Sequence, residues 1–145
     1  MNNVSEIQVS NSSSETPKVK ISTTEIAYRV FLENWDLKTI ELCEEFKILC
    51  LNRANEVLGI YNHSKGGKTG TVIDQKLIFA TALKCNAPAI IICHNHPSGN
   101  LTASESDIKL TKKLKKCGSF LEINVIDHLI ISKNGYLSFI SSEIM

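Results

Sequence analysis

The stretch that decides the fold is Ala89–Pro97, with the sequence AIIICHNHP. Its first five residues are small or apolar, which is typical of a strand buried on both faces of a sheet. Residues two apart on a strand project to the same side, so His94 and His96 can direct imidazole nitrogens to one point. Pro97 ends the strand, because proline cannot donate to a sheet ladder. The stretch therefore predicts a buried strand that ends in two candidate metal ligands.

A third candidate ligand lies in the helix that we expect over roughly residues 103–117. A catalytic zinc site needs three protein ligands, with water in the fourth position. Asp107 is the nearest candidate, and it follows a loop containing Gly and Asn that could fold the chain back. If the helix begins near Ala103, Asp107 lies on its inward face and points back towards the strand end.

Two capping patterns compete at the start of this helix. In the first pattern Ser104 is the N-cap and pairs with Asp107, which would then serve only the start of the helix. Thr102 with Glu105 is the preferred pattern, because it satisfies the helix start and leaves Ser104 and Asp107 free. We therefore predict Thr102 as the N-cap.

The remaining sequence predicts an α/β domain with a mixed sheet and flanking helices, because hairpin patterns alternate with helical ones. It does not indicate a doubly wound sheet. The expected elements are a first helix from residue 22 or 23, a hairpin of 46–51 with 57–61, a loop over 63–68, a short strand over 69–73, a helix over 75–85 capped by Asp74, and a hairpin of 121–131 with 136–140.

Length and composition place the chain among single-domain globular proteins. It has 145 residues, a net charge of +1 and five cysteines without C-x-x-C spacing. These features predict a cytoplasmic protein with reduced thiols, no membrane span, and no strong electrostatic attraction to nucleic acid. Residues 1–21 are expected to form a flexible polar tail without a secretory signal, and residues 22–145 the folded domain.

Three other functional patterns carry less weight. The stretch 67–69, GKT, resembles the end of a P-loop, but Asn62 stands where its earlier glycine belongs. A zinc deaminase is excluded because His96 occupies the place of the motif's glutamate and no C-x-x-C follows. The lysines between residues 109 and 116 are expected to form a solvated helix face.

The motif His94-x-His96-Pro97 followed by Ser104-x-x-Asp107 resembles the JAMM/MPN+ metalloproteases. The fuller stretch 94–100, HNHPSGN, is similar to the bacterial RadC branch, which was historically labelled a DNA-repair protein. Segments 74–83, 127–128 and 136–139 share this similarity, which covers roughly residues 40–145. The resemblance implies a JAMM/MPN-like fold, related to that of cytidine deaminases.

The resemblance also implies a role for each matching residue. It assigns the three zinc ligands to His94, His96 and Asp107. It assigns stabilisation of the developing oxyanion to Ser104 and the general base to Glu44, with Glu45 as the alternative if the strand register differs by one. The implied activity is a zinc-dependent hydrolysis of amide bonds in a peptide or protein substrate.

One departure from the family affects the expected partners. RadC proteins usually carry an N-terminal helix-hairpin-helix segment, whereas this sequence begins with a short polar stretch. The alternative function is therefore a non-catalytic DNA-repair accessory, or a nucleic-acid-associated module that retains a metal. Glu44 and Ser104 favour the enzyme, because a structural zinc site closes its fourth position with another Cys or His.

Overall fold

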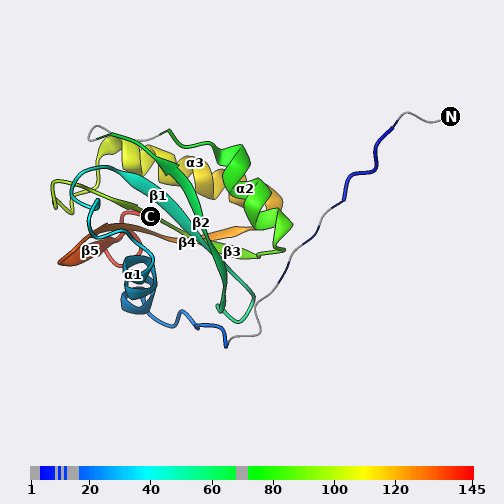
Figure 1. Ribbon diagram of the computed structural model, residues 1–145, viewed down its shortest axis with the longest axis horizontal. Helices are drawn as coiled ribbons and strands as arrows, with labels where there is room; N and C mark the ends of the chain where they lie inside the picture. The colour runs from blue at the N-terminus through cyan, green and yellow to red at the C-terminus, as the bar shows by residue number, and fades with distance from the viewer. Residues whose placement is uncertain (1–3, 9, 11, 13–16, 68–71) are drawn as a thin grey trace.

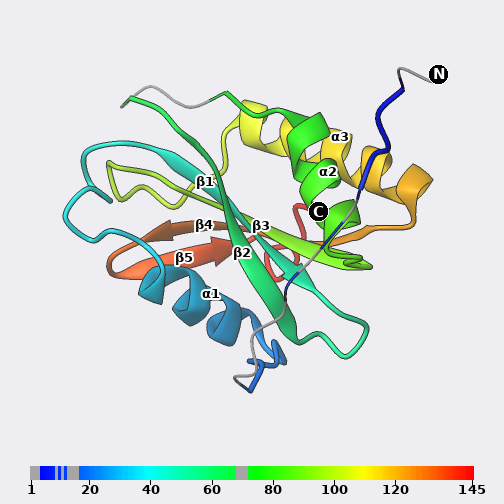
Figure 2. The same ribbon diagram turned by 45° about the vertical axis from the view of Figure 1, so that its right-hand side comes forward.

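The computed structural model describes residues 4–8, 10, 12, 17–67 and 72–145 and shows a three-layer α/β arrangement (Figure 1). One five-stranded sheet, of order β2-β1-β3-β4-β5, carries α1 on one face and α2 and α3 on the other (Figure 2). The elements are α1 (Thr24–Glu33), β1 (Glu45–Leu51), β2 (Val57–Lys65), α2 (Gln75–Lys84), β3 (Ala89–Asn95), α3 (Glu105–Leu121), β4 (Asn124–Ser132) and β5 (Gly135–Ser138). Within the described residues β3 and β4 pair in parallel and the other strand pairs are antiparallel, so the predicted mixed sheet is confirmed.

The central strand β3 is buried along its whole length and divides two hydrophobic cores. Ile92 packs into the core beneath α2 and α3, which we call the α2/α3 face. Cys93 packs into the core beneath α1, the α1 face. Because side chains alternate along a strand, His94 continues the α2/α3 face and Asn95 continues the α1 face. This alternation positions the candidate site.

Several local predictions are confirmed. β1 and β2 form the expected hairpin, in which the Asn52 side chain accepts hydrogen bonds from the backbone of Ala54 and Glu56, and Asn55 takes a left-handed conformation with φ 59°. Helix α2 begins after Asp74, whose carboxylate accepts a hydrogen bond from the Lys76 N–H as an N-cap should. β4 and β5 form the second predicted hairpin.

The start of α3 differs from the prediction. The helix begins at Glu105 and its N-cap is Ser104, so the choice of Thr102 was wrong. Ser104 and Asp107 form a reciprocal capping box, which satisfies two backbone N–H groups at once. The helix also continues past the expected end at residue 117, as far as Leu121.

The end of β2 was also wrongly predicted. Residues 63–65 are strand and not loop, because Ser64 and Lys65 pair with Phe46 and Glu45 of β1. β2 is an edge strand, which accepts polar side chains without losing its ladder. Most of the strand predicted over 69–73 lies outside the described residues, and Val72 and Ile73 belong to no strand.

Other features concern the start of the chain, its cysteines and its surface. Val19 and Lys20 belong to the stretch predicted to be a flexible tail, yet the Val57 N–H donates to the Val19 carbonyl at 2.8 Å and Lys20 pairs with Glu56, just before β2. All five cysteines are free. The lysines of α3 are exposed, as expected for a solvated face. In the part of the chain that the structure describes, every helix is too short or too polar to cross a membrane.

Candidate metal centre

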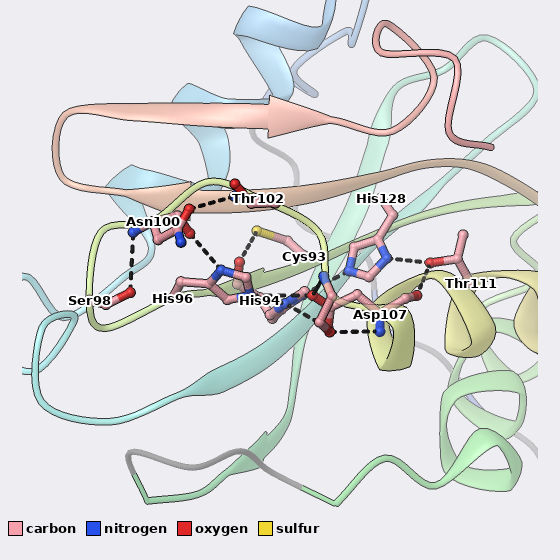
Figure 3. A network of polar contacts seen from close by, with 10 residues as sticks. Cys93, His94, His96, Ser98, Asn100, Thr102, Asp107, Thr111 and His128 are labelled. Carbon is pink, nitrogen blue, oxygen red and sulfur yellow. Dashed lines mark hydrogen bonds and ion pairs between the residues drawn. The ribbon is translucent and has the colours of Figure 1, made fainter.

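Three candidate ligands converge where β3 ends and α3 begins (Figure 3). The Nε2 atoms of His94 and His96 lie 3.0 Å apart. Asp107 places Oδ1 3.3 Å from His94 Nε2 and Oδ2 3.4 Å from His96 Nε2. Two ligand atoms about 2.0–2.1 Å from a tetrahedral zinc ion lie roughly 3.3 Å apart. The separations between these three side chains therefore fit a zinc ion.

His96 presents its Nε2 lone pair to this point because its other nitrogen is committed. His96 Nδ1 lies 2.6 Å from the carbonyl oxygen of Asn100, which can only accept a hydrogen bond. The imidazole proton must therefore sit on Nδ1. The loop that brings Asn100 back turns at Gly99, which has φ 80° and donates its N–H to the His96 carbonyl. This positive φ suits glycine.

Asp107 serves both the helix and the candidate centre. Its Oδ2 accepts the Ser104 N–H at 2.9 Å, while the Ser104 hydroxyl accepts the Asp107 N–H at 3.0 Å. Burial opposes ionisation of Asp107, but its close contacts with the imidazoles of His94 and His96 outweigh burial and hold the pKa of the carboxyl well below its usual range. The capping interaction and the ligand role therefore share one carboxylate: Oδ2 accepts the Ser104 N–H and faces His96, while Oδ1 faces His94.

The chemistry of this donor set favours a cation. His96 Nε2 carries a lone pair and Asp107 is an ionised carboxylate, so acceptors face each other at hydrogen-bonding distance. Such a set is completed either by a proton or by a metal ion. With two imidazoles and one carboxylate, zinc is a suitable ion, and three protein ligands leave one coordination position open.

Glu44 lies on the same side of the sheet as the three ligands. Phe46 pairs with His94 and their rings stack at 6.2 Å, so both occupy the α2/α3 face. Glu44 is two residues before Phe46 and its backbone pairs with Gly66 and Gly67, which extends the β1–β2 ladder. The pKa of His96 is raised chiefly by its hydrogen bond to Asp107, and the Glu44 carboxylate makes a small further contribution. Glu45 lies on the opposite face by the same alternation.

Asn95 fixes the chain segment that leads to Glu44. Its fully buried amide donates to the carbonyls of Ile40 at 2.6 Å and Cys43 at 2.9 Å. Its Oδ1 accepts the Glu45 N–H at 2.7 Å. Asn95, which lies between the two candidate histidine ligands, thus anchors the segment that leads into β1, and it does so from the α1 face.

Replacing Asn95 by aspartate is expected to destabilise the fold by roughly 2–4 kcal/mol, because a buried acceptor would then face the carbonyls of Ile40 and Cys43. Urea unfolding measures this change in the free energy of unfolding. Asn134→Asp is the matched control, since Asn134 is exposed in the β4–β5 turn and should change stability by less than about 0.5 kcal/mol. Equal unfolding midpoints for the two variants would contradict the role assigned to Asn95.

Zinc affinity is expected to fall as the pH is lowered. The hydrogen bond to Asp107 raises the pKa of His96, so His96 remains protonated to higher pH than an ordinary histidine. A proton on Nε2 blocks ligation, and binding must displace it. Below the His96 pKa the affinity should drop by about tenfold per pH unit for each proton displaced. Chelator competition between about pH 8 and pH 5.5 measures this slope, and a flat profile would contradict it.

Sequence reasoning assigned no role to two polar residues that support the candidate ligands. His128 Nε2 lies 2.8 Å from His94 Nδ1, and Thr111 Oγ1 lies 2.6 Å from His128 Nδ1. Burial lowers the pKa of His128 well below its usual value. A signal existed in each case: His128 interrupts an apolar strand, and Thr111 lies one helical turn after Asp107 on the same face.

Comparison with known proteins agrees with this geometry. The chain matches the RadC-like JAB domain over residues 21–144 and belongs to that family. A UPF0758 protein of Flavobacterium johnsoniae is 45% identical over 101 residues, which cover 70% of this chain and 44% of the relative. A UPF0758 protein of Clostridium botulinum is 42% identical over 119 residues, 82% of this chain and 51% of the relative. The chain thus spans about half the length of the curated relatives it matches.

Proposed function

We propose that this domain is a zinc-dependent hydrolase that cleaves amide bonds in a peptide or protein substrate. The observation that carries the proposal is the convergence of His94, His96 and Asp107 at 3.0–3.4 Å, with one coordination position left open. A purely structural zinc site would be closed by a fourth protein ligand. Membership of the RadC-like JAB family supports the same conclusion.

In this proposal His94, His96 and Asp107 would hold the zinc ion, which would acidify a water molecule and polarise the scissile carbonyl. Glu44, on the same face of the sheet, accepts the water proton and later delivers it to the leaving amine. The Ser104 hydroxyl accepts the Asp107 N–H, but its own proton has no acceptor among the described residues. That proton is free to bond to a developing oxyanion, which makes Ser104 an auxiliary group.

A cavity of about 400 Å³ beside His96 offers room for the substrate. The loop 97–99 and Leu101 line one side of it, and residues 132–134 of the β4–β5 turn line the other. A larger cavity of about 620 Å³ lies at the opposite end of β3, against Pro88 and Ile123. Of these two cavities, the smaller is the better candidate substrate site, because the proposed ligand His96 lines it.

The test is a search for new peptide ends. The zinc-loaded chain is incubated with a proteome-derived peptide library, and newly formed amino termini are identified by mass spectrometry. Cleavage by the parent chain that is lost in Glu44→Gln and kept in Glu45→Gln would support the proposal. Absence of cleavage together with zinc-independent, salt-sensitive binding to nucleic acid would overturn it in favour of an accessory role through the exposed lysines of α3.

A further inference from the structure

A buried chain of polar contacts runs from the candidate metal centre into the core (Figure 3). It begins at His94 Nδ1, passes through both nitrogens of His128 and reaches the hydroxyl of Thr111, with separations of 2.8 and 2.6 Å. The Thr111 hydroxyl then donates to the backbone carbonyl of Asp107 at 2.7 Å. All three side chains are at most 2% exposed, so water does not compete for these contacts.

The donor and acceptor of every hydrogen bond in this series of contacts follow from the last one, between Thr111 and the Asp107 carbonyl. A carbonyl only accepts, so the single hydroxyl proton of Thr111 is spent on Asp107. Thr111 Oγ1 must therefore accept from His128, which places a proton on His128 Nδ1. Among the described residues His128 has no carboxylate as a hydrogen-bond partner, and a buried imidazolium without one would be costly. His128 is therefore neutral, and its Nε2 carries a lone pair.

The same logic fixes the protonation of His94. Because His128 Nε2 accepts, His94 Nδ1 must carry the proton that is donated across 2.8 Å. The lone pair of His94 then lies on Nε2, the atom that faces His96 and Asp107. The opposite polarity would leave a proton on Nε2 and remove His94 from any metal site. The geometry thus selects the one neutral tautomer of His94 that can act as a ligand.

Packing keeps the chain of contacts from His94 through His128 to Thr111, the His128 relay, in place. The His128 ring stacks on Phe139 with centroids 4.4 Å apart and meets the edge of Phe46 at 6.1 Å. Phe46 also stacks on His94, so one aromatic ring restrains both imidazoles. His96 does not depend on this arrangement, because a backbone carbonyl sets its tautomer. The two histidines are therefore oriented by independent devices, one in the core and one in a surface loop.

We propose that His128, held by Thr111, is a positioning residue that sets the tautomer and ring orientation of His94 for metal binding. This inference rests on the proposed metal site. The link from Thr111 to the Asp107 carbonyl gives it a second consequence: one hydroxyl connects the strand that carries His94 to the helical turn that carries Asp107. The placement of two proposed ligands is thereby coupled inside the core.

The test compares two substitutions at Thr111 in the full chain. Thr111→Val keeps the shape of the side chain but removes the acceptor for His128, whereas Thr111→Ser keeps the hydroxyl and loses only a methyl group. Zinc affinity is measured by competition with a chromophoric chelator. Thr111→Val should bind zinc roughly 10- to 100-fold more weakly than the parent, the usual effect of losing an outer-shell partner. Thr111→Ser should stay close to the parent value.

A second measurement needs no substitution. Nitrogen-15 NMR of the parent chain with labelled histidines reports which imidazole nitrogen carries the proton, and we expect Nδ1 in both His94 and His128. A proton on His128 Nε2, or equal zinc affinities for the valine and serine variants, would overturn the inference. Should the parent chain bind no zinc, the proposed function fails, while the tautomer of His128 in the metal-free protein still decides the relay. Neither readout depends on hydrolytic activity.

Discussion

Replacing Glu44 by glutamine is expected to lower the turnover of an identified peptide substrate by roughly 100- to 10,000-fold, the usual contribution of a positioned general base. Glutamine keeps the size of the side chain but cannot accept a proton. Zinc content and the urea unfolding midpoint should stay close to those of the parent, because Glu44 is not among the three proposed ligands. Steady-state kinetics on one cleaved peptide measures the effect.

Glu45→Gln is the matched control, because it makes the same chemical change one residue away on the other face of the sheet. Asn95 holds the backbone of Glu45, and strand alternation directs its side chain to the α1 face, away from the metal centre. We expect turnover near the parent value. If Glu45→Gln instead abolished turnover, the face assignment of β1 would be wrong. If both variants remained active, Glu44 would no longer be a candidate base.

Replacing Asp107 by alanine is expected to produce two separable losses. The purified parent chain should carry about one zinc ion, and removal of one of three protein ligands should weaken zinc binding by at least roughly 100-fold. The variant also loses half of the capping box of α3, which costs about 1 kcal/mol of stability. Elemental analysis and chelator competition measure the first loss, and urea unfolding measures the second.

Ser104→Ala separates these two effects. It removes the hydroxyl that caps the Asp107 N–H, so its cost in stability should be similar, at about 1 kcal/mol. The backbone N–H of residue 104 still orients Asp107 Oδ2, so zinc affinity should fall by no more than about tenfold. Full zinc occupancy in Asp107→Ala would contradict the ligand assignment, whatever happened to the stability.

Patterns confined to one element were predictable from the sequence. The apolar run 89–93 predicts a buried strand, and the Asp74 cap predicts where α2 begins; the structure confirms both. The start of α3 was not predictable, because Thr102 and Ser104 head overlapping capping patterns. Ser104 prevails as the cap, and Asp107 takes part in the capping box without leaving the candidate centre.

Features that depend on strand register could not be read from the sequence. The choice between Glu44 and Glu45 depends on the pairing of Phe46 with His94, which brings residues 48 positions apart opposite each other. The relay through His128 depends on the parallel pairing of β3 with β4, including the irregularity between Ile90 and Ile91 in that register. The spacing of apolar residues within one segment carries no information about either contact, because both contacts are made between segments that are distant in the sequence.

The charges of the donor set have a consequence for proton transfer. His96 enters the set neutral, with its proton on the Asn100 side, and Asp107 contributes one negative charge. With a neutral His94, a bound dication would leave an excess of one positive charge, which an ionised Glu44 on the same face would balance. A proton passed to Glu44 would then move within a group of zero net charge. The candidate metal centre would then never hold an uncompensated charge, which keeps the desolvation penalty of the proposed chemistry low.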